Sequence, residues 1–382
     1  MIYLDNNATT RLAPEALDAM MPFLADEFGN PSSAHQLGRT AREAVESARA
    51  SVARLVGALH PEEIFFTSGG TESDNWALLG SLRSGEKRHV ITTEVEHEAV
   101  RKTADRLEAD GCRITRLGVD EFGQIDLDEL SKTLSPETAI VSIMHANNET
   151  GVLFPIEEAA AIVKERSDAL FHVDGVNAVG KAAVDLKNSD IDLYSLSAHK
   201  FHGPKGVGAL YVRNDVELRP MVTGGGQERN LRSGTLAVHQ IAGFGAAARF
   251  VSDLSAMELV RVLRDRLEYE ILEKIPNSRL NGTSDRDRRV PNTTNISFEN
   301  TNGEQILVRL NDQEIFVSTG SACASEDHSA SPVLQAMNVP YSYAMGSIRF
   351  SLGRYTTDAE IGEVLERLPT IVEELRSIAA SA

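Results

Sequence analysis

Cysteine is scarce in this sequence. The chain of 382 residues has two cysteines, Cys112 and Cys323. Two are too few for the disulfide framework of a small secreted domain, and too few for a tetrahedral zinc site built on thiolates. We therefore expect neither a disulfide framework nor a metal, and the reducing cytoplasm is the default compartment.

Basic residues and long apolar runs are also in short supply. Lys plus Arg is 38 against 56 for Asp plus Glu, a formal net charge of −18. A body this acidic repels nucleic-acid phosphate and anionic membrane surfaces, so neither is expected as a direct partner. No run approaches the roughly 20 apolar residues that cross a bilayer. The segment Met1–Asn7 lacks the basic start and apolar centre of a secretory signal.

The overall composition, 42% hydrophobic and 25% charged, is typical of a globular protein. Short apolar runs alternate with amphipathic stretches between residues 60 and 213, which predicts an α/β fold with a mostly parallel sheet and helices on both faces. The seven expected strands are Glu63–Thr67, His89–Thr92, Arg113–Leu117, Ala139–Met144, Leu170–Asp174, Asp192–Ser195 and Gly208–Val212.

Amphipathic helices are expected on either side of this region, because apolar residues recur there at spacings of three and four. These helices are Leu37–Val56, Leu259–Ile275 and Ile361–Ile378. Pro291–Phe298 and Gln313–Ser318 have the pattern of strands. This order predicts a smaller α+β domain of residues 261–382, joined by residues 1–14, beside a large α/β domain of residues 15–260.

Polar residues gather where five of the expected strands end. Ligands of an open α/β sheet bind beyond the carboxyl ends of its strands. The five segments are Thr67–Ser73, Glu94–His97, His145–Glu149, Asp174–Asn177 and Ser197–Lys200. Five such loops in phase predict one shared site.

The loop Ser68–Thr71 carries two glycines before an expected helix. Gly70 would let a phosphate approach the backbone N–H groups at the start of that helix, and Thr71 could add a hydroxyl. An ordinary turn with a helix cap explains the pattern equally well. The loop is neither a Walker A motif nor a dinucleotide fingerprint.

Lys200 directly follows an expected buried strand. Desolvation there lowers the pKa of an amine and makes it a nucleophile suited to a Schiff base. The alternative is a solvated lysine at a strand end. The glycine-rich run Gly203–Gly208 favours the first interpretation, because it would hold Lys200 in a defined position.

Asp174 ends an apolar run, and His97 follows another. A buried carboxylate needs a partner, and a protonated pyridine nitrogen is one that would keep Asp174 ionised. Its alternative role is a helix cap. His97 could stack on a flat ring or move protons, although a structural role is the more common one. The spacing of the histidines fits no zinc motif.

Cys323 lies in a loop of small and polar residues, which favours a nucleophilic thiol, whereas Cys112 is expected to be inert. Arg349 lies within a strand-like run. An inward-facing guanidinium there needs an anion and suits a substrate carboxylate, or else forms a structural ion pair.

Together these segments resemble the cysteine desulfurases, in the class V aminotransferase group of pyridoxal-phosphate enzymes, and most of all the branch that serves iron–sulfur cluster and nitrogenase assembly. The matching segments occur in family order over nearly the whole chain. They are Tyr3–Thr10, Gly29–Ser33, Phe66–Ser73, Ala146–Gly151, Ser195–Gly208, Gly224–Arg229, Arg232–Thr235, Gly320–Cys323 and Ile348–Arg354.

The resemblance implies fold type I and the cofactor pyridoxal 5'-phosphate. Lys200 would bind the cofactor covalently and later move the α-proton of the substrate. Thr235 would reach the phosphate of the neighbouring subunit, which implies a homodimer. The other phosphate ligands would be Gly70, Thr71, Ser197 and His199.

The resemblance also implies how the ring and the substrate L-cysteine are held. Asp174 would pair with the pyridine nitrogen, and His97 would stack on the ring. Cys323 would attack the substrate sulfur, release L-alanine and keep a persulfide for a sulfur-acceptor protein. Residues near the ring oxygen and the substrate carboxylate would be Asn30, Asn148, Asn177 and Arg349.

Three departures from the family pattern stand out. Asn177 replaces a Gln that usually donates to the ring oxygen, and it is one methylene shorter. Glu326 and Asp327 follow the thiol and should raise its pKa. Leu236 stands where a Glu-Asn pair is common.

Two other functions remain open. One is a selenocysteine lyase or another β-eliminating enzyme of the same fold, and the other is a non-catalytic platform for sulfur transfer. An iron–sulfur scaffold is the expected sulfur acceptor, but transfer-RNA thiolation and DNA sulfur modification begin with the same persulfide.

Overall fold

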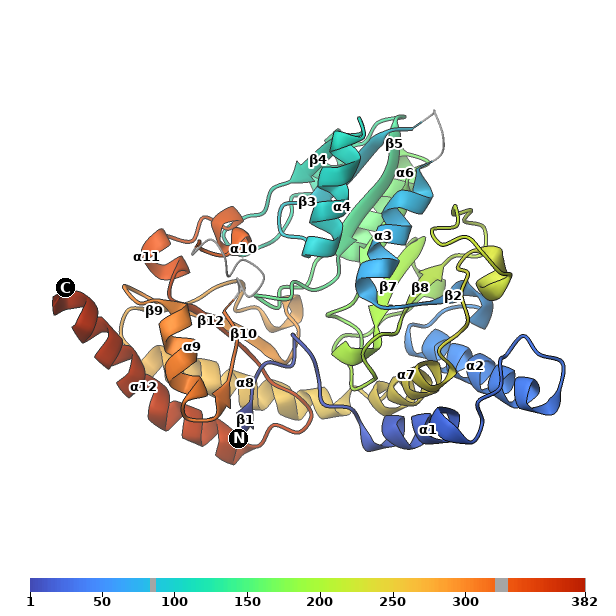
Figure 1. The fold of residues 1–382 in the computed structure, drawn as a ribbon. Helices are drawn as coiled ribbons and strands as arrows, with labels where there is room; N and C mark the ends of the chain where they lie inside the picture. Colours follow the sequence, from blue (N-terminus) through green and yellow to red (C-terminus); the bar gives the residue numbers. More distant parts are fainter. Residues whose placement is uncertain (83–86, 320–328, 382) are drawn as a thin grey trace.

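A computed structural model describes residues 1–82, 87–319 and 329–381 (Figure 1). Its main feature is a seven-stranded sheet in the order β2-β8-β7-β6-β5-β3-β4. The strands are β2 (Ile64–Thr67), β3 (His89–Thr93), β4 (Arg113–Leu117), β5 (Thr138–Met144), β6 (Leu170–Asp174), β7 (Leu193–Ser197) and β8 (Gly208–Val212). Only β8 runs antiparallel to its neighbours β2 and β7. The mostly parallel sheet and all seven expected strands are confirmed.

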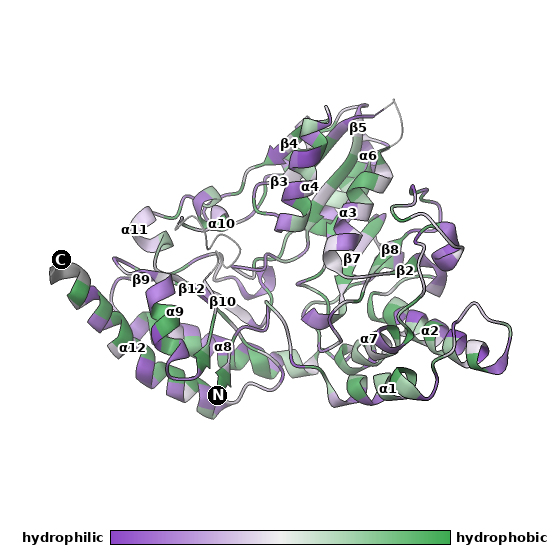
Figure 2. Cartoon of the chain, viewed as in Figure 1, coloured by the Kyte–Doolittle hydropathy of each residue, from purple (hydrophilic) through white to green (hydrophobic). Residues whose placement is uncertain are grey.

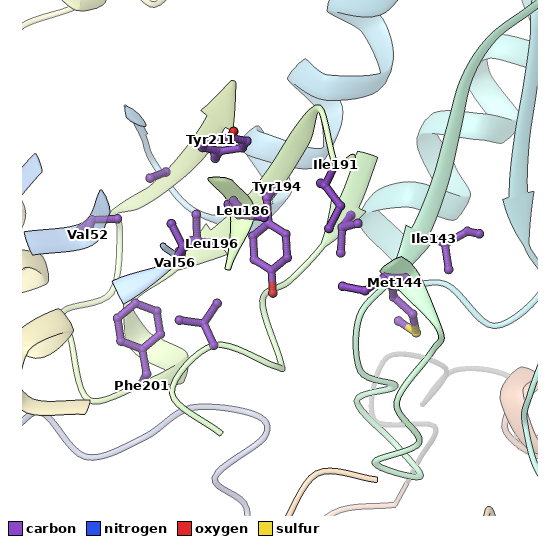
Figure 3. Packing of buried hydrophobic residues seen from close by; sticks show 14 of the residues in the cluster. Val52, Val56, Ile143, Met144, Leu186, Ile191, Tyr194, Leu196, Phe201 and Tyr211 are labelled. Carbon is purple, nitrogen blue, oxygen red and sulfur yellow. The ribbon is translucent and has the colours of Figure 1, made fainter. Parts of the chain in front are cut away.

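The strands are rich in apolar residues and buried because helices cover both faces of the sheet. Every residue of the strands other than the edge strand β4 is buried, apart from Leu170. On one face Trp76 of α3 (Gly70–Ser81) and Val100 of α4 (Glu98–Ala109) pack with Phe65 and Val90. On the other face, Figure 3 shows Val52 and Val56 near Tyr194 and Leu196. The helices on this second face include α2 (Gln36–Leu55), α6 (Ile156–Arg166) and α7 (Val238–Val251).

Small residues let α7 sit close to its two neighbours, α1 (Pro14–Ala25) and α2. A Cβ on Gly243 would lie 2.6 Å from the Cγ of Met20, and one on Gly245 would lie 2.5 Å from the Cα of Ala48. Larger side chains at these positions would push the helices apart. The hydropathy colouring shows how the apolar residues gather between the helices and the sheet (Figure 2).

A second apolar core lies around a three-stranded antiparallel sheet of order β12-β10-β9. Its strands are β9 (Ser278–Leu280), β10 (Thr293–Phe298) and β12 (Ser347–Ser351), and its helices are α8 (Ser255–Lys274), α9 (Gly303–Asn311) and α12 (Asp358–Ser381). Two short helices, α10 (Pro332–Ala336) and α11 (Tyr341–Ala344), precede β12. The helices α2, α8 and α12 and the strand β10 were predicted to within a few residues, whereas α9 was not predicted.

The N-terminal segment joins the two cores. β1 (Ile2–Tyr3) pairs in parallel with β11 (Ile315–Phe316), and Leu4 is buried in the second core. The chain then crosses to the large sheet, where the backbone N–H of Thr10 donates to the carbonyl of His199 at 2.9 Å. This packing agrees with the expectation that the first residues accompany the C-terminal region, while the domain boundary at residue 260 stays a prediction.

Within the described residues, no helix combines the length and the apolar character that crossing a membrane requires.

Candidate active site at the carboxyl edge of the sheet

Lys200 is the last residue of a short 3-10 helix, Ala198–Lys200, that directly follows β7. The turn is tight, because the N–H of Gly203 donates to the carbonyl of Ala198 at 2.9 Å and a Cβ on Gly203 would lie 2.7 Å from that of Ala198. The partly buried amine donates to the backbone carbonyl of Asn7 at 2.5 Å. The predicted role of the glycine-rich run, which is to hold Lys200, agrees with this geometry.

Asp174 is buried at the end of β6, and its Oδ1 accepts the N–H of Val176 at 3.0 Å. The carboxylate therefore caps the turn that follows, although no helix begins there. Burial raises the pKa of Asp174, and the nearby His97 and Lys200 oppose that rise. A cationic partner would favour the ionised form further.

His97 lies beside this carboxylate: Asp74, His97 and Asp174 each offer an atom within 4.8 Å of the others. His97 is also the N-cap of α4, where its Nδ1 accepts the N–H of Ala99 at 3.1 Å. The structural role is therefore real. The hydrogen bond to Ala99 also serves the site, because it fixes the orientation of the His97 ring.

Two further carboxyl groups are buried near Asp174. Asp74 and Glu96 are each at most 3% exposed, and each has one oxygen without a hydrogen-bond partner in the described structure. Burial raises the pKa of Glu96 to about 8 and that of Asp74 well above its usual range. The adjacent His172 cannot neutralise them, because burial lowers its pKa to about 3. Burial thus favours the protonated forms of Asp74 and Glu96, whereas the charge of Lys200 favours the ionised form of Asp174.

The loop before α3 has features that suit an anion. The N-cap of α3 is Gly69, which offers no side-chain cap, so the first N–H groups of the helix have no acceptor within it. A Cβ on Gly70 would lie 2.6 Å from Val176 and 3.6 Å from the Cβ of Ser197. The buried start of α3 therefore packs closely against the turn after β6 and the end of β7, and Thr71 is exposed.

Charges and hydrogen bonds around this loop also suit a phosphate. Glu72 would repel an anion, but Arg232 pairs with both of its oxygens, at 2.7 and 3.0 Å. His199 is held by a hydrogen bond of 3.1 Å between its Nδ1 and the hydroxyl of Thr9. Burial and the charge of Lys200 lower the pKa of His199 to about 4, so its ring is a neutral hydrogen-bond partner.

Arg349, on β12, forms the ion pair that was the alternative to substrate binding. Its two terminal nitrogens donate to the Oδ1 of Asp5 at 2.8 Å and to the backbone carbonyl of Asn148 at 3.0 Å. Its buried Nε has no partner in the described structure. One donor of the fork therefore remains for a ligand.

These residues fit pyridoxal phosphate: an amine for its aldehyde, a buried carboxylate for its ring nitrogen, an oriented imidazole and an uncapped helix for its phosphate. Residues 2–364 match the family model described as Aminotransferase class-V. The chain is 52% identical to the "Cysteine desulfurase" of Trichormus azollae over 381 residues, which cover 99% of this chain and 94% of that relative. The chain belongs to the class V aminotransferases and, among them, to the cysteine desulfurases.

Further relatives support the same assignment. "Cysteine desulfurase NifS" of Azotobacter vinelandii is 48% identical over 380 residues, 99% of this chain and 94% of that relative. A solved structure described as "NIFS-LIKE PROTEIN" superposes with a TM-score of 0.91 at 39% identity and covers 98% of this chain and 100% of that one. The cysteine desulfurase described here thus has the fold type I architecture and depends on pyridoxal phosphate.

Two expected site residues, Asn30 and Thr235, have no described contact with the site around Lys200. Asn30 is exposed in the turn before α2, where its Oδ1 accepts the N–H of Ser32 at 2.9 Å. Thr235 is exposed beyond Arg232. Neither has a described contact with Lys200 or Arg349. Cys323 lies outside the residues that the structure describes.

Sequence reasoning missed four residues of this desulfurase site. Asn7 and Asp5 were noted only as part of a matching segment, and Lys181 and Glu96 received no role. Glu96 stands directly before His97 at the end of a buried strand, so its position was a usable signal. Asn7 had none of its own, because its contacts come from residues far away in the sequence.

Proposed function

We propose that Lys200 binds the cofactor of this desulfurase and moves the α-proton of L-cysteine. The observation that carries this proposal is the position of the amine: it ends a rigid turn next to the buried Asp174 and the oriented His97. Pyridoxal phosphate, when bound, supplies the electron sink that stabilises the charge left by removal of the α-proton. Asp174 would keep the ring nitrogen protonated, and His97 would cover one face of the ring.

We assign the phosphate to the start of α3, with Gly70 and Thr71, and to Ser197 and His199. Their support is the uncapped helix and the pairing of Glu72 with Arg232. We assign the carboxylate of the substrate to the free Nε edge of Arg349. Asn148 and Asn177 would serve the ring oxygen, because Asn148 adjoins Arg349 and Asn177 is buried three residues after Asp174.

The sulfur would go to Cys323. Its thiolate would attack the sulfur of the bound cysteine, so that one S–S bond forms and the C–S bond breaks with its electron pair on the β-carbon. Protonation of that carbon gives L-alanine, and the enzyme keeps a persulfide. A lyase that releases its product directly would have no need of this thiol.

We further propose a homodimer in which Asn30 and Thr235 act in the site of the partner. Both are exposed and neither has a described contact with the amine of its own chain, which supports roles across an interface. We expect the reaction in the cytoplasm and the division into domains near residue 260.

We propose an iron–sulfur scaffold as the acceptor of the persulfide sulfur. The support is the similarity to the relative named NifS and to the assembly branch of the family. The test supplies ³⁵S-cysteine to the purified protein together with a scaffold protein, a transfer-RNA thiolation carrier or a DNA-modification partner. Transfer to the scaffold at the fastest rate supports the assignment, and preferential transfer to either of the others contradicts it.

The experiment for the reaction itself compares the native protein with Cys323→Ala. Native protein should form one alanine per sulfur transferred and carry a persulfide on Cys323. The variant should bind the cofactor normally, with an unchanged absorption band, and lose alanine formation at least a hundredfold. Full turnover by the variant would contradict the role of Cys323 and favour direct elimination.

A further inference from the structure

A second amine lies beside Lys200. Lys181 is partly buried, four residues after Asn177. Its Nζ lies 3.1 Å from the Oδ1 of Asn7 and 3.5 Å from the Oδ1 of Asn177. Because Asn7 also accepts the bond from Lys200 through its backbone carbonyl, one residue holds both amines on the same side of the site.

The position of Lys181 is well fixed because Asn7 is. The Oδ1 of Asn7 also accepts a hydrogen bond of 3.1 Å from Asn292. Its Nδ2 donates to the carbonyl of Asn148 at 3.1 Å and to the hydroxyl of Thr293 at 2.8 Å. Two donors at the oxygen and two acceptors at the nitrogen leave one orientation for this amide.

The ammonium of Lys181 in turn orients Asn177. A lysine only donates, so the amide atom that faces it must be the oxygen. The Nδ2 of Asn177 therefore points elsewhere, and it has no acceptor in the described structure. Asn177 is buried and follows Asp174 by three residues, so this donor lies in the turn that begins at the end of β6.

The charge of Lys181 acts on the same place. Burial, together with the charges of Lys200 and Arg349, lowers the pKa of Lys181 to about 7. Burial lowers the pKa of His199 to about 4 and also lowers that of His202, so these rings add little positive charge here. Asp174 is the acid that interacts with Lys200. Asp5 is engaged by Arg349. An anionic oxygen bound near Lys200 would raise the pKa of Lys181 again and favour its charged form, and that charge would in turn stabilise the anion.

We propose that Lys181 is a positioning residue that turns the amide donor of Asn177 toward the ring oxygen of the cofactor and places a positive charge beside it. The inference rests on the proposed role of Lys200, because the ring carbon that bears this oxygen adjoins the carbon that carries the aldehyde. Asn177 is one methylene shorter than the Gln that is usual at this position, and Lys181 would orient its amide despite that shorter side chain.

The test uses the apoenzyme refilled with pyridoxal phosphate. The variants are Lys181→Gln, Asn177→Ala and the double variant, and the control is Lys187→Gln, an exposed lysine that removes the same charge. Two quantities are measured: the dissociation constant of the cofactor, and the apparent pKa of its absorption band. Lys181→Met, which has nearly the same length, replaces Lys181→Gln if that variant does not fold.

Loss of the charge in Lys181→Gln should raise the apparent pKa of the band by about one unit and weaken cofactor binding about tenfold. Because Lys181 acts on the cofactor partly through Asn177 and partly through its own charge, the loss of affinity in the double variant should be smaller than the product of the two single losses. Lys187→Gln should match the native protein. A native-like titration of Lys181→Gln, or a double variant whose losses multiply, overturns the proposal. Alanine formation by the native protein tests the proposed function separately.

Discussion

The amine of Lys200 donates a hydrogen bond to the backbone carbonyl of Asn7 across 193 positions of sequence. The segment that carries Asn7 leaves the second core at Leu4 and reaches the loop after β7 at Thr10. This segment thus lines the site, and the side chain of Asn7 donates a hydrogen bond to Thr293 on β10. The site therefore depends on the packing of the N-terminal segment between the two cores.

Asn7→Ala should destabilise the protein and loosen the site, because it removes four hydrogen bonds of a buried amide and leaves their partners unsatisfied. We expect the free energy of unfolding to fall by roughly 2–4 kcal/mol, with a loss of cofactor affinity. Urea denaturation measures the first effect. Asn188→Ala, at an exposed site, should change neither, and an Asn7→Ala protein of native stability would contradict this role.

Gly70→Ala should impair cofactor binding more than folding. Its Cβ would lie 2.6 Å from Val176, so the turn after Asp174 or the start of α3 must shift. We expect a loss of cofactor affinity of about tenfold or more, with overpacking that costs about 1–3 kcal/mol. Gly118→Ala is the matched control, because nothing lies within 4 Å of its Cβ. Equal cofactor titrations for the two variants would argue against a phosphate at α3.

Glu96 makes stability depend on pH. Its pKa is raised to about 8 in the folded protein, so the folded state holds a proton that the unfolded chain releases above about pH 4.5. The stabilisation that Glu96 gives the folded protein is fully present below about pH 4.5 and is lost as the pH rises toward 8. The slope approaches 1.4 kcal/mol per pH unit at most.

Glu96→Gln should remove this slope. Urea denaturation between pH 5 and pH 8 should show the variant gaining stability relative to the native protein as pH rises. Glu94 lies two residues before Glu96 and is exposed, so Glu94→Gln should follow the native curve. Parallel curves for Glu96→Gln and the native protein would mean that Glu96 is ionised in the fold.

Arg349→Lys should affect binding of L-cysteine rather than that of the cofactor. A lysine keeps the charge but loses the planar fork that spans Asp5 and the carbonyl of Asn148. We expect KM to rise about tenfold while the cofactor band stays unchanged. Arg309→Lys, at an exposed site, should have no effect. An unchanged KM would leave Arg349 with only its structural ion pair.

The sequence was sufficient for the large sheet because its strands are buried on both faces and therefore read as apolar runs. The site followed from the same pattern, since the carboxyl ends of parallel strands meet at one edge. This reasoning predicted one site that contains Lys200, Asp174 and His97, and in the structure both Lys200 and His97 interact electrostatically with Asp174. It also placed Gly70 at the start of a helix next to Ser197.

Long-range contacts could not be read in this way. The pair of Asp5 and Arg349 spans 344 positions, and neither residue has a local pattern that reveals the other. Lys181 looked like a surface lysine, because burial of an amine leaves no mark in the sequence. Asp74, in the first turns of a helix, had the appearance of an ordinary exposed acid, although it is buried beneath Asp174.

The central claim is that the amine of Lys200 binds the aldehyde of pyridoxal phosphate. The most direct measurement is borohydride reduction of the protein refilled with the vitamer, followed by peptide mass spectrometry. The account predicts one irreversible adduct, on Lys200, and its disappearance in Lys200→Ala. A protein that stays colourless, or an adduct that forms on Lys181 or elsewhere while Lys200 remains unmodified, would contradict it.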